Sequence, residues 1–272
     1  MKIHCIRTGT VVLKQALYSL TRPAGARALR ILVDPRLTPP LPICCWLIEH
    51  PEGLIMVDTG ELARASDPSF FYEDRDYRRL IKVAHAAAFS TKLSDEVGPQ
   101  LARLGINART DVRSVILTHL HCDHADGLKY FPNAHIMVSR AEFAQTHYAF
   151  PRTWPIWFRP TLVDYTDGAF GAFAACKRVT DAGDVLLVPT PGHTFGHQSV
   201  MIRSGDRWVC LAGDATHTEG QLSAGEPTGG VADVKTARAT LATLSRHRAQ
   251  LPLLYLPSHD PASPDKLAAW SK

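Results

Sequence analysis

The segment from Ser114 to Asp126, S-V-I-L-T-H-L-H-C-D-H-A-D, constrains the fold more than any other part of the chain. It begins within an apolar, β-branched run over 112–117, which is typical of a buried strand. The run is followed at once by four side chains of the kinds that bind metal ions: His119, His121, Asp123 and His124. The segment therefore predicts a buried strand that ends at a metal site.

The spacing of these four side chains indicates two metal ions. Side chains two residues apart in an extended or turning backbone lie on the same side, so His119 and His121 converge on one point. Asp123 and His124 follow immediately and must face a second point close by. Imidazole and carboxylate ligands suit zinc, and also manganese or iron. A purely structural role is disfavoured, because so many ionisable groups would lose their hydration with no cation in return.

The length, composition and net charge of the chain are those of a globular protein, so we expect a globular metalloprotein. The chain has 272 residues, of which 45% are hydrophobic and 21% charged, enough for one large domain or two. The net charge is +4 and basic residues form no long run, so we expect neither a nucleic-acid partner nor a membrane partner. Residues 1–20 lack the apolar stretch of a signal peptide. The six cysteines form no C-x-x-C pair, which favours free thiols and a cytoplasmic location.

Hydrophobic patterns predict the elements around this segment. Apolar and β-branched runs predict strands over 2–6, 10–13, 28–33, 43–49, 54–57, 112–117, 135–138, 185–188, 198–203, 207–211 and 253–256. Helical signals occur over 94–104, 127–131, 140–147 and 231–247. Residues 65–92, with several aromatic side chains, predict either a loop over the site or a cluster packed beneath it. The proline- and tryptophan-rich residues 148–160 predict either the wall of an apolar pocket or plain core.

The two halves of the chain repeat one pattern. Each has hairpin strands, a strand that ends in an acid beside a glycine, a helix, and a strand that ends in a histidine. Asp58 and His119 in the first half thus correspond to Asp214 and His259 in the second. No linker separates the halves. We therefore predict a single domain over 1–272, in which two similar β-then-α halves pack sheet to sheet, with the site along one edge.

The motifs together resemble the metallo-β-lactamase superfamily, whose signature H-x-H-x-D-H matches residues 119–124. Supporting motifs are V-D-T-G at 57–60, T-P-G-H-T-F-G-H-Q-S at 190–199, G-D at 213–214 and S-H-D at 258–260. Within the superfamily, the chain is most similar to the N-acyl homoserine lactone lactonases, which are quorum-quenching hydrolases. The resemblance implies an α/β fold, the αβ/βα four-layer sandwich. It also implies two divalent metal ions, zinc first, with manganese, iron or cobalt as alternatives.

The resemblance also implies a role for each candidate side chain. It implies two ligand sets: His119, His121 and His193 for the first ion, and Asp123, His124 and His259 for the second. Asp214 would bridge both ions together with a hydroxide. Asp58 would orient a ligand, although a simple turn-capping aspartate is the alternative. His197 matches a family histidine for which a structural role is expected.

One position departs from the family pattern. These lactonases generally carry a tyrosine three residues after the bridging aspartate, where its hydroxyl contacts the substrate carbonyl. This chain has His217 there. Imidazole also donates hydrogen bonds, so we expect His217 to contact the carbonyl oxygen. The alternative is a solvated loop residue.

The function implied by the resemblance is the opening of a lactone ring by the bridging hydroxide, with an N-acyl homoserine lactone as the leading small-molecule substrate. Asp123 would pass the proton to the leaving ring oxygen. The alternatives are a hydrolase of another lactone or ester and, on the same fold, a mono-iron persulfide dioxygenase. The sequence does not determine the oligomeric state, and a homodimer is one of the alternatives.

Overall fold

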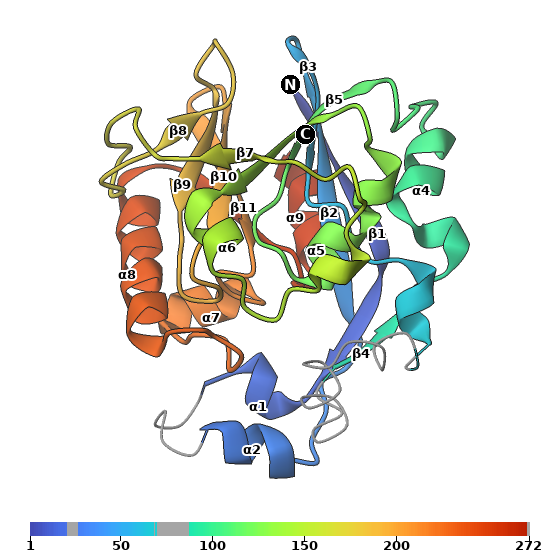
Figure 1. The fold of residues 1–272 in the computed structure, drawn as a ribbon. Helices are drawn as coiled ribbons and strands as arrows, with labels where there is room; N and C mark the ends of the chain where they lie inside the picture. The colour runs from blue at the N-terminus through green and yellow to red at the C-terminus, as the bar shows by residue number, and fades with distance from the viewer. Residues whose placement is uncertain (21–26, 68, 70–86, 271–272) are drawn as a thin grey trace.

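A computed structural model of the chain describes residues 1–20, 27–67, 69 and 87–270. Two β-sheets lie face to face, and helices cover their outer sides (Figure 1). This arrangement confirms the predicted αβ/βα sandwich. Most of the aromatic segment within 65–92 lies outside the described residues, so its two interpretations stay predictions.

Among the described residues, the larger sheet contains seven strands in the order β4-β1-β2-β3-β5-β6-β7. Its strands are β1 (Lys2–Leu13), β2 (Leu41–His50), β3 (Gly53–Val57), β4 (Ala87–Ser90), β5 (Val112–Ile116), β6 (His135–Ser139) and β7 (Thr161–Val163). The pairs β4-β1, β1-β2 and β2-β3 are antiparallel, whereas β3, β5, β6 and β7 run parallel.

The smaller sheet contains five strands in the order β12-β11-β10-β9-β8. Its strands are β8 (Lys177–Arg178), β9 (Val185–Pro189), β10 (Gln198–Ser204), β11 (Arg207–Gly213) and β12 (Leu253–Pro257). An antiparallel run again leads into a parallel strand, because β12 pairs parallel to β11 just as β5 pairs parallel to β3. The two halves therefore share the topology that the sequence pattern predicted.

The helices are mostly short. Those in the described part of the chain are α1 (Gln15–Tyr18), α2 (Arg27–Val33), α4 (Val97–Arg103), α5 (Cys122–Ala125), α6 (Arg140–Ala144), α7 (Glu219–Ala224), α8 (Val234–Gln250) and α9 (Ser263–Trp270). Single 3₁₀ turns cover Ala63–Ser66, Leu93–Asp95, Asp126–Tyr130 and Pro151–Thr153. Within the described part of the chain, every helix is too short or too polar to cross a membrane.

Strand β2 shows why the sheets stack. Its side chains alternate between two buried faces. Cys45 and Leu47 pack on the outer face of the sheet, under α4, whereas Trp46 and Ile48 pack on the inner face, between the two sheets. The inward face meets β10 and β11 of the other sheet, for example at Val200. A strand buried on both faces reads as a continuous apolar run, which is the pattern over 43–49.

One predicted element is wrong. Residues 28–33 were expected to form a strand, but they lie in helix α2, which contacts α1 at the edge of the molecule (Figure 1). A short apolar run does not distinguish strand from helix. No sheet edge pairs with this segment among the described strands, so its backbone groups bond within a helix instead. The sequence prediction also missed strands β4, β7 and β8 and helices α1, α5, α7 and α9. The strands expected over 2–6 and 10–13 form the single strand β1, and the helix expected over 140–147 ends at Ala144.

Candidate metal centre

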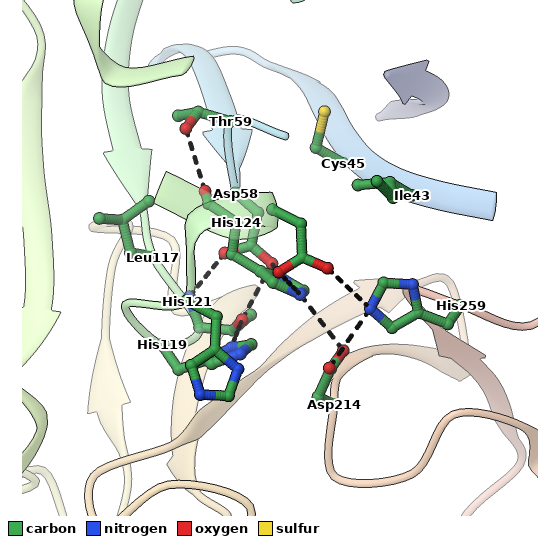
Figure 2. Close-up of polar contacts among 12 residues, drawn as sticks. Ile43, Cys45, Asp58, Thr59, Leu117, His119, His121, His124, Asp214 and His259 are labelled. Atoms are coloured by element: carbon green, nitrogen blue, oxygen red, sulfur yellow. Dashed lines mark hydrogen bonds and ion pairs between the residues drawn. The ribbon is translucent and has the colours of Figure 1, made fainter. Parts of the chain in front are cut away.

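The predicted ligands meet at one end of both sheets, where parallel strands terminate. His119 to His124 follow β5, Asp214 follows β11, and His259 lies just beyond β12 (Figures 1 and 2). His193 lies in the loop between β9 and β10. The carboxyl ends of neighbouring parallel strands lie together at the same edge of a sheet, which explains how residues distant in sequence converge.

The convergent side chains form two groups. One potential ligand atom from each member lies within 4.8 Å of the others in the group His119, His121, His193 and Asp214, and likewise in the group Asp123, His124 and His259. Asp214 also touches the second group, because its Oδ2 lies 3.3 Å from His259 Nε2 and its Oδ1 lies 3.3 Å from His124 Nε2 (Figure 2). Within the first group, its Oδ2 lies 3.4 Å from His193 Nε2. These are the two sets that the family resemblance implied, with Asp214 between them.

The chemistry of this donor set fits two divalent cations. His119 Nε2 and His121 Nε2 are buried, and neither makes a hydrogen bond to any described residue. A buried polar atom without a partner is costly, and two such nitrogens in the first group are explained by a cation that they would bind. In the second group, His124 Nε2 lies 3.3 Å from Asp214 Oδ1. Imidazole nitrogens with carboxylate oxygens are the ligands of zinc sites.

Burial keeps the first group of imidazoles neutral. It lowers the pKa of His119 and of His193 well below the usual value, and it lowers the pKa of His121 to about 3. A neutral imidazole offers a lone pair to a cation without first losing a proton. The first group is therefore ready to bind a metal ion at neutral pH.

The second group carries charge. Burial opposes a proton on His124 and on His259, but the nearby Asp214 carboxylate raises the pKa of both above the usual value. Burial likewise opposes the charge on Asp214, yet His259 and His124 hold the pKa of this carboxyl well below its usual range. The centre therefore contains a buried carboxylate that attracts positive charge, which metal ions would supply in place of protons.

Asp58 orients two of these histidines. It is fully buried, and its Oδ2 accepts hydrogen bonds from His124 Nδ1 at 2.8 Å and from Thr118 Oγ1 at 2.9 Å. Its Oδ1 accepts from Thr118 N at 2.7 Å. The Thr118 hydroxyl in turn lies 3.0 Å from His119 Nδ1, from which it accepts. With Nδ1 occupied in this way, the Nε2 atoms of His119 and His124 are left for a metal ion.

The backbone at Asp58 supports a role beyond turn capping. Its φ angle is +58°, one of two positive values on non-glycine residues in the described chain. Such a conformation is strained and persists where the surroundings over-determine it, often at functional sites. Thr118, the other member of this network, was not singled out from the sequence, although it directly precedes the H-x-H-x-D-H motif.

Comparisons with known proteins agree with this geometry. The family model of the metallo-beta-lactamase superfamily matches residues 38–259. The chain belongs to the metallo-β-lactamase superfamily. An N-acyl homoserine lactonase of Bacillus cereus is 31% identical over 211 residues, which cover 72% of this chain and 75% of the relative. A Mycobacterium bovis protein named "Probable metallo-hydrolase Mb2322c" is 34% identical over 187 residues; the match spans 65% of this chain and 57% of that protein.

Solved structures show the same fold at lower identity. An N-acyl homoserine lactone hydrolase with N-hexanoyl-L-homoserine bound at its catalytic metal centre superposes with a TM-score of 0.77 at 24% identity, covering 96% of this chain and 93% of that one. The dizinc quorum-quenching lactonase AidC gives a TM-score of 0.64 at 19% identity, covering 95% and 87%. The expected resemblance to the lactonases of the superfamily is thus confirmed.

Glu142 joins the two loops that carry the first group, a feature that the sequence interpretation missed. This glutamate of α6 is fully buried and accepts hydrogen bonds from Leu120 N, from Thr194 Oγ1 and from Gly196 N. Leu120 lies between two candidate ligands, and Thr194 follows His193. The only signal in the sequence was an acid within a segment predicted to be helical, so the contact could not be foreseen.

His197 positions Asp214, and it does not belong to either ligand group. Its Nε2 accepts the Asp214 backbone N–H at 2.9 Å, and its Nδ1 lies 2.9 Å from Thr190 Oγ1. A Cβ atom at Gly213 would lie 2.7 Å from His197 Nε2 and 2.8 Å from Thr118 Oγ1, and the φ angle there is +54°. The G-D motif therefore needs glycine at this position, and the geometry agrees with the structural role expected for His197.

His217 lies at the centre and is only 3% exposed, so the alternative of a solvated loop residue is wrong. Its Nε2 lies 3.9 Å from Asp214 Oδ2. Its ring packs 5.4 Å from the ring of Tyr18 at an interplanar angle of 21°. Burial lowers the pKa of His217 to about 4, so this imidazole is neutral at physiological pH.

The aromatic segment over 148–160 packs mainly into the core. Phe158 belongs to the cluster under α4, Trp154 and Trp157 pack against the same cluster, and Phe150 is buried elsewhere. Tyr148, at the start of the segment, instead lies near the centre, with its ring 6.3 Å from that of His121. The structure therefore favours core over pocket wall for the tryptophans.

Proposed function

We propose that the chain is a dinuclear metal hydrolase that opens lactone rings, with N-acyl homoserine lactones as the first substrate class. The observation that carries this proposal is the position of Asp214. Its Oδ2 reaches a histidine of each ligand group, at 3.4 Å for His193 and 3.3 Å for His259. A carboxylate shared in this way supports two ions side by side. The similarity to an N-acyl homoserine lactonase over 72% of the chain supports the substrate class.

Two bound divalent ions would lower the pKa of water to about 7 and so supply hydroxide at neutral pH. The chain's own residues would do the rest. Asp58 keeps His124 in the tautomer that leaves Nε2 free, and His197 holds the loop of Asp214 in place. Asp123 would pass a proton to the leaving ring oxygen.

Zinc is the metal that we propose, because imidazole and carboxylate are its usual ligands. Manganese, iron or cobalt would also accept this set. Among the described residues, neither group of candidate ligands contains a cysteine, and all six cysteines are free thiols. Free thiols support the proposed cytoplasmic location, where disulfides are rare.

The first experiment measures metal content. Protein purified without chelator should contain close to two equivalents of zinc, manganese, iron or cobalt per chain, because seven ligands exceed what one tetrahedral site uses. A single tightly bound iron, with oxygen uptake on glutathione persulfide, would instead identify a persulfide dioxygenase.

The second experiment measures turnover on a substrate panel. The panel contains homoserine lactones of short and long acyl chain, simple aliphatic and aromatic lactones, a glutathione thioester, a phosphodiester and a β-lactam. The metal-loaded enzyme should prefer lactones, and the same protein stripped by a chelator is the matched control. Much faster turnover of the thioester or phosphodiester than of every lactone would overturn the proposal.

A further inference from the structure

The hydrogen bonds around His217 determine which of its ring nitrogens carries the proton. Its Nδ1 lies 3.1 Å from the backbone oxygen of Tyr18, and Gln221 Nε2 donates to the same oxygen at 2.9 Å. A carbonyl oxygen only accepts hydrogen bonds, so the ring nitrogen that contacts it must donate. In the neutral imidazole the proton therefore lies on Nδ1, and Nε2 carries a lone pair.

This arrangement is built into the backbone. The His217 N–H donates to Gln221 Oε1 at 2.8 Å, and Gln221 also takes part in the capping box that begins α7. The segment of Tyr18 is attached to the loop after α7 by three backbone hydrogen bonds. Leu20 N donates to Pro227 O, and both Gly229 N and Gly230 N donate to Leu17 O. The Tyr18 carbonyl, which accepts from Nδ1, is thus held in place by Gln221 and by the loop after α7. Among the described residues, Nδ1 of His217 has no other hydrogen-bond partner.

The free Nε2 faces the middle of the metal centre. It lies 3.9 Å from Asp214 Oδ2, and the His217 ring lies 5.5 Å from the ring of His259 and 6.2 Å from that of His193. Nε2 and the Asp214 carboxylate are both acceptors, so no hydrogen bond joins them. A substrate atom that approaches Nε2 is stabilised if it is a proton donor, and repelled if it is a carbonyl oxygen.

We infer that His217 Nε2 accepts a hydrogen bond from an N–H group of the substrate. The inference rests on the proposed function and narrows the substrate to lactones that bear an amide N–H next to the ring carbonyl. An N-acyl homoserine lactone has such a group on the ring carbon beside the carbonyl. His217 therefore acts as a specificity residue with the opposite hydrogen-bond direction to the carbonyl donor expected from the sequence.

The first test observes the tautomer directly, without turnover. Nitrogen NMR of protein labelled in histidine, with the His217 signals assigned by their loss in His217→Gln, should show a protonated Nδ1 and an unprotonated Nε2. The pattern should hold in the zinc-loaded and in the metal-free protein, because the Tyr18 carbonyl and not a metal imposes it. A proton on Nε2 would overturn the inference, whatever the enzyme hydrolyses.

The second test compares two lactones that differ in one atom. One carries the acyl chain through an amide N–H, and the other carries the same chain through an ester oxygen. Replacement of His217 by Phe should lower kcat/KM for the amide by about tenfold to a hundredfold, because its N–H loses the acceptor. The loss for the ester should be much smaller. His217→Gln, whose amide oxygen again accepts, should restore the preference for the amide substrate.

The outcomes separate this inference from the proposed function. An equal loss for amide and ester in His217→Phe overturns the inference and leaves lactone hydrolysis in place. Failure of the parent enzyme to hydrolyse any lactone overturns the proposed function, and the NMR measurement still decides the tautomer. Metal content and thermal unfolding of each variant show whether a loss of rate reflects a lost hydrogen bond or a lost fold.

Discussion

Replacing Asp58 by Asn should weaken metal binding while keeping the size of the side chain. Asp58 Oδ2 accepts from His124 Nδ1 at 2.8 Å and from Thr118 Oγ1 at 2.9 Å, and Oδ1 accepts from Thr118 N. In the asparagine side chain, the amide oxygen would keep the hydrogen bond from Thr118 N, and the NH₂ group would face Thr118 Oγ1 and His124 Nδ1. The His124 ring would then have to accept at Nδ1 and carry its proton on Nε2, where it blocks the lone pair meant for the metal ion.

The size of the effect follows from this change of tautomer. Removing a carboxylate that orients a ligating histidine typically costs ten- to a hundredfold in metal affinity, or about 1.4–2.7 kcal/mol. We expect the upper part of this range, because the same carboxylate also supports His119 through the Thr118 hydroxyl. The affinity should fall most for the second ion, which the group of Asp123, His124 and His259 would bind.

The assay is zinc affinity by competition with a chromophoric chelator at fixed pH, together with metal content after gel filtration. Asp184→Asn is a matched control, because Asp184 also pairs with a buried histidine, His50 Nε2 at 3.1 Å, at the far end of β2. This control should bind zinc like the parent. Two zinc ions bound to Asp58→Asn with parental affinity would refute the reasoning.

Three further predictions concern the same centre. Glu142→Gln should lower the free energy of unfolding by about 1–3 kcal/mol in urea denaturation, because an NH₂ group replaces a buried acceptor of hydrogen bonds from both ligand loops; unchanged unfolding would show that the loops do not depend on it. Zinc binding should release protons from His124 and His259, whose pKa values Asp214 raises, so the affinity for zinc should fall as the pH is lowered. Calorimetry in buffers of different ionisation enthalpy measures the released protons, and a value of zero would contradict the prediction. Gly213→Ala should lower Tm and metal content more than Gly205→Ala, because both glycines have positive φ but only a Cβ at Gly213 meets neighbouring atoms, the nearest at 2.7 Å; equal losses in the two variants would mean that backbone strain alone matters.

The sequence predicted most of the strands, because burial imposes a local pattern. The run over 112–117 is β5, and the hairpin expected over 43–57 is β2 and β3. The segment over 28–33 was assigned wrongly, since an apolar run of that length suits a strand or a helix equally. Only its place in the fold, beside α1 and away from both sheets, determined that it is α2.

The candidate ligands were also foreseeable, because their residue types and spacing carry the chemistry. The H-x-H-x-D-H motif contains four of them. The other three, His193, Asp214 and His259, were predicted from motifs shared with the family. The structure brings all seven into two groups. Their grouping depends on parallel strand ends in two sheets, which no local pattern describes.

The polar contacts that orient the centre were decided by tertiary structure alone. Glu142 bonds to Gly196, 54 residues away, and Asp58 to His124, 66 residues away, so neither partner can be read from neighbouring residues. The direction of the His217 hydrogen bond is the clearest case, because it depends on the carbonyl of Tyr18, 199 residues distant in sequence. Residue types determine which atoms are able to bind metal or donate protons. Which nitrogen of a histidine holds the proton depends on the partner that the fold places beside it.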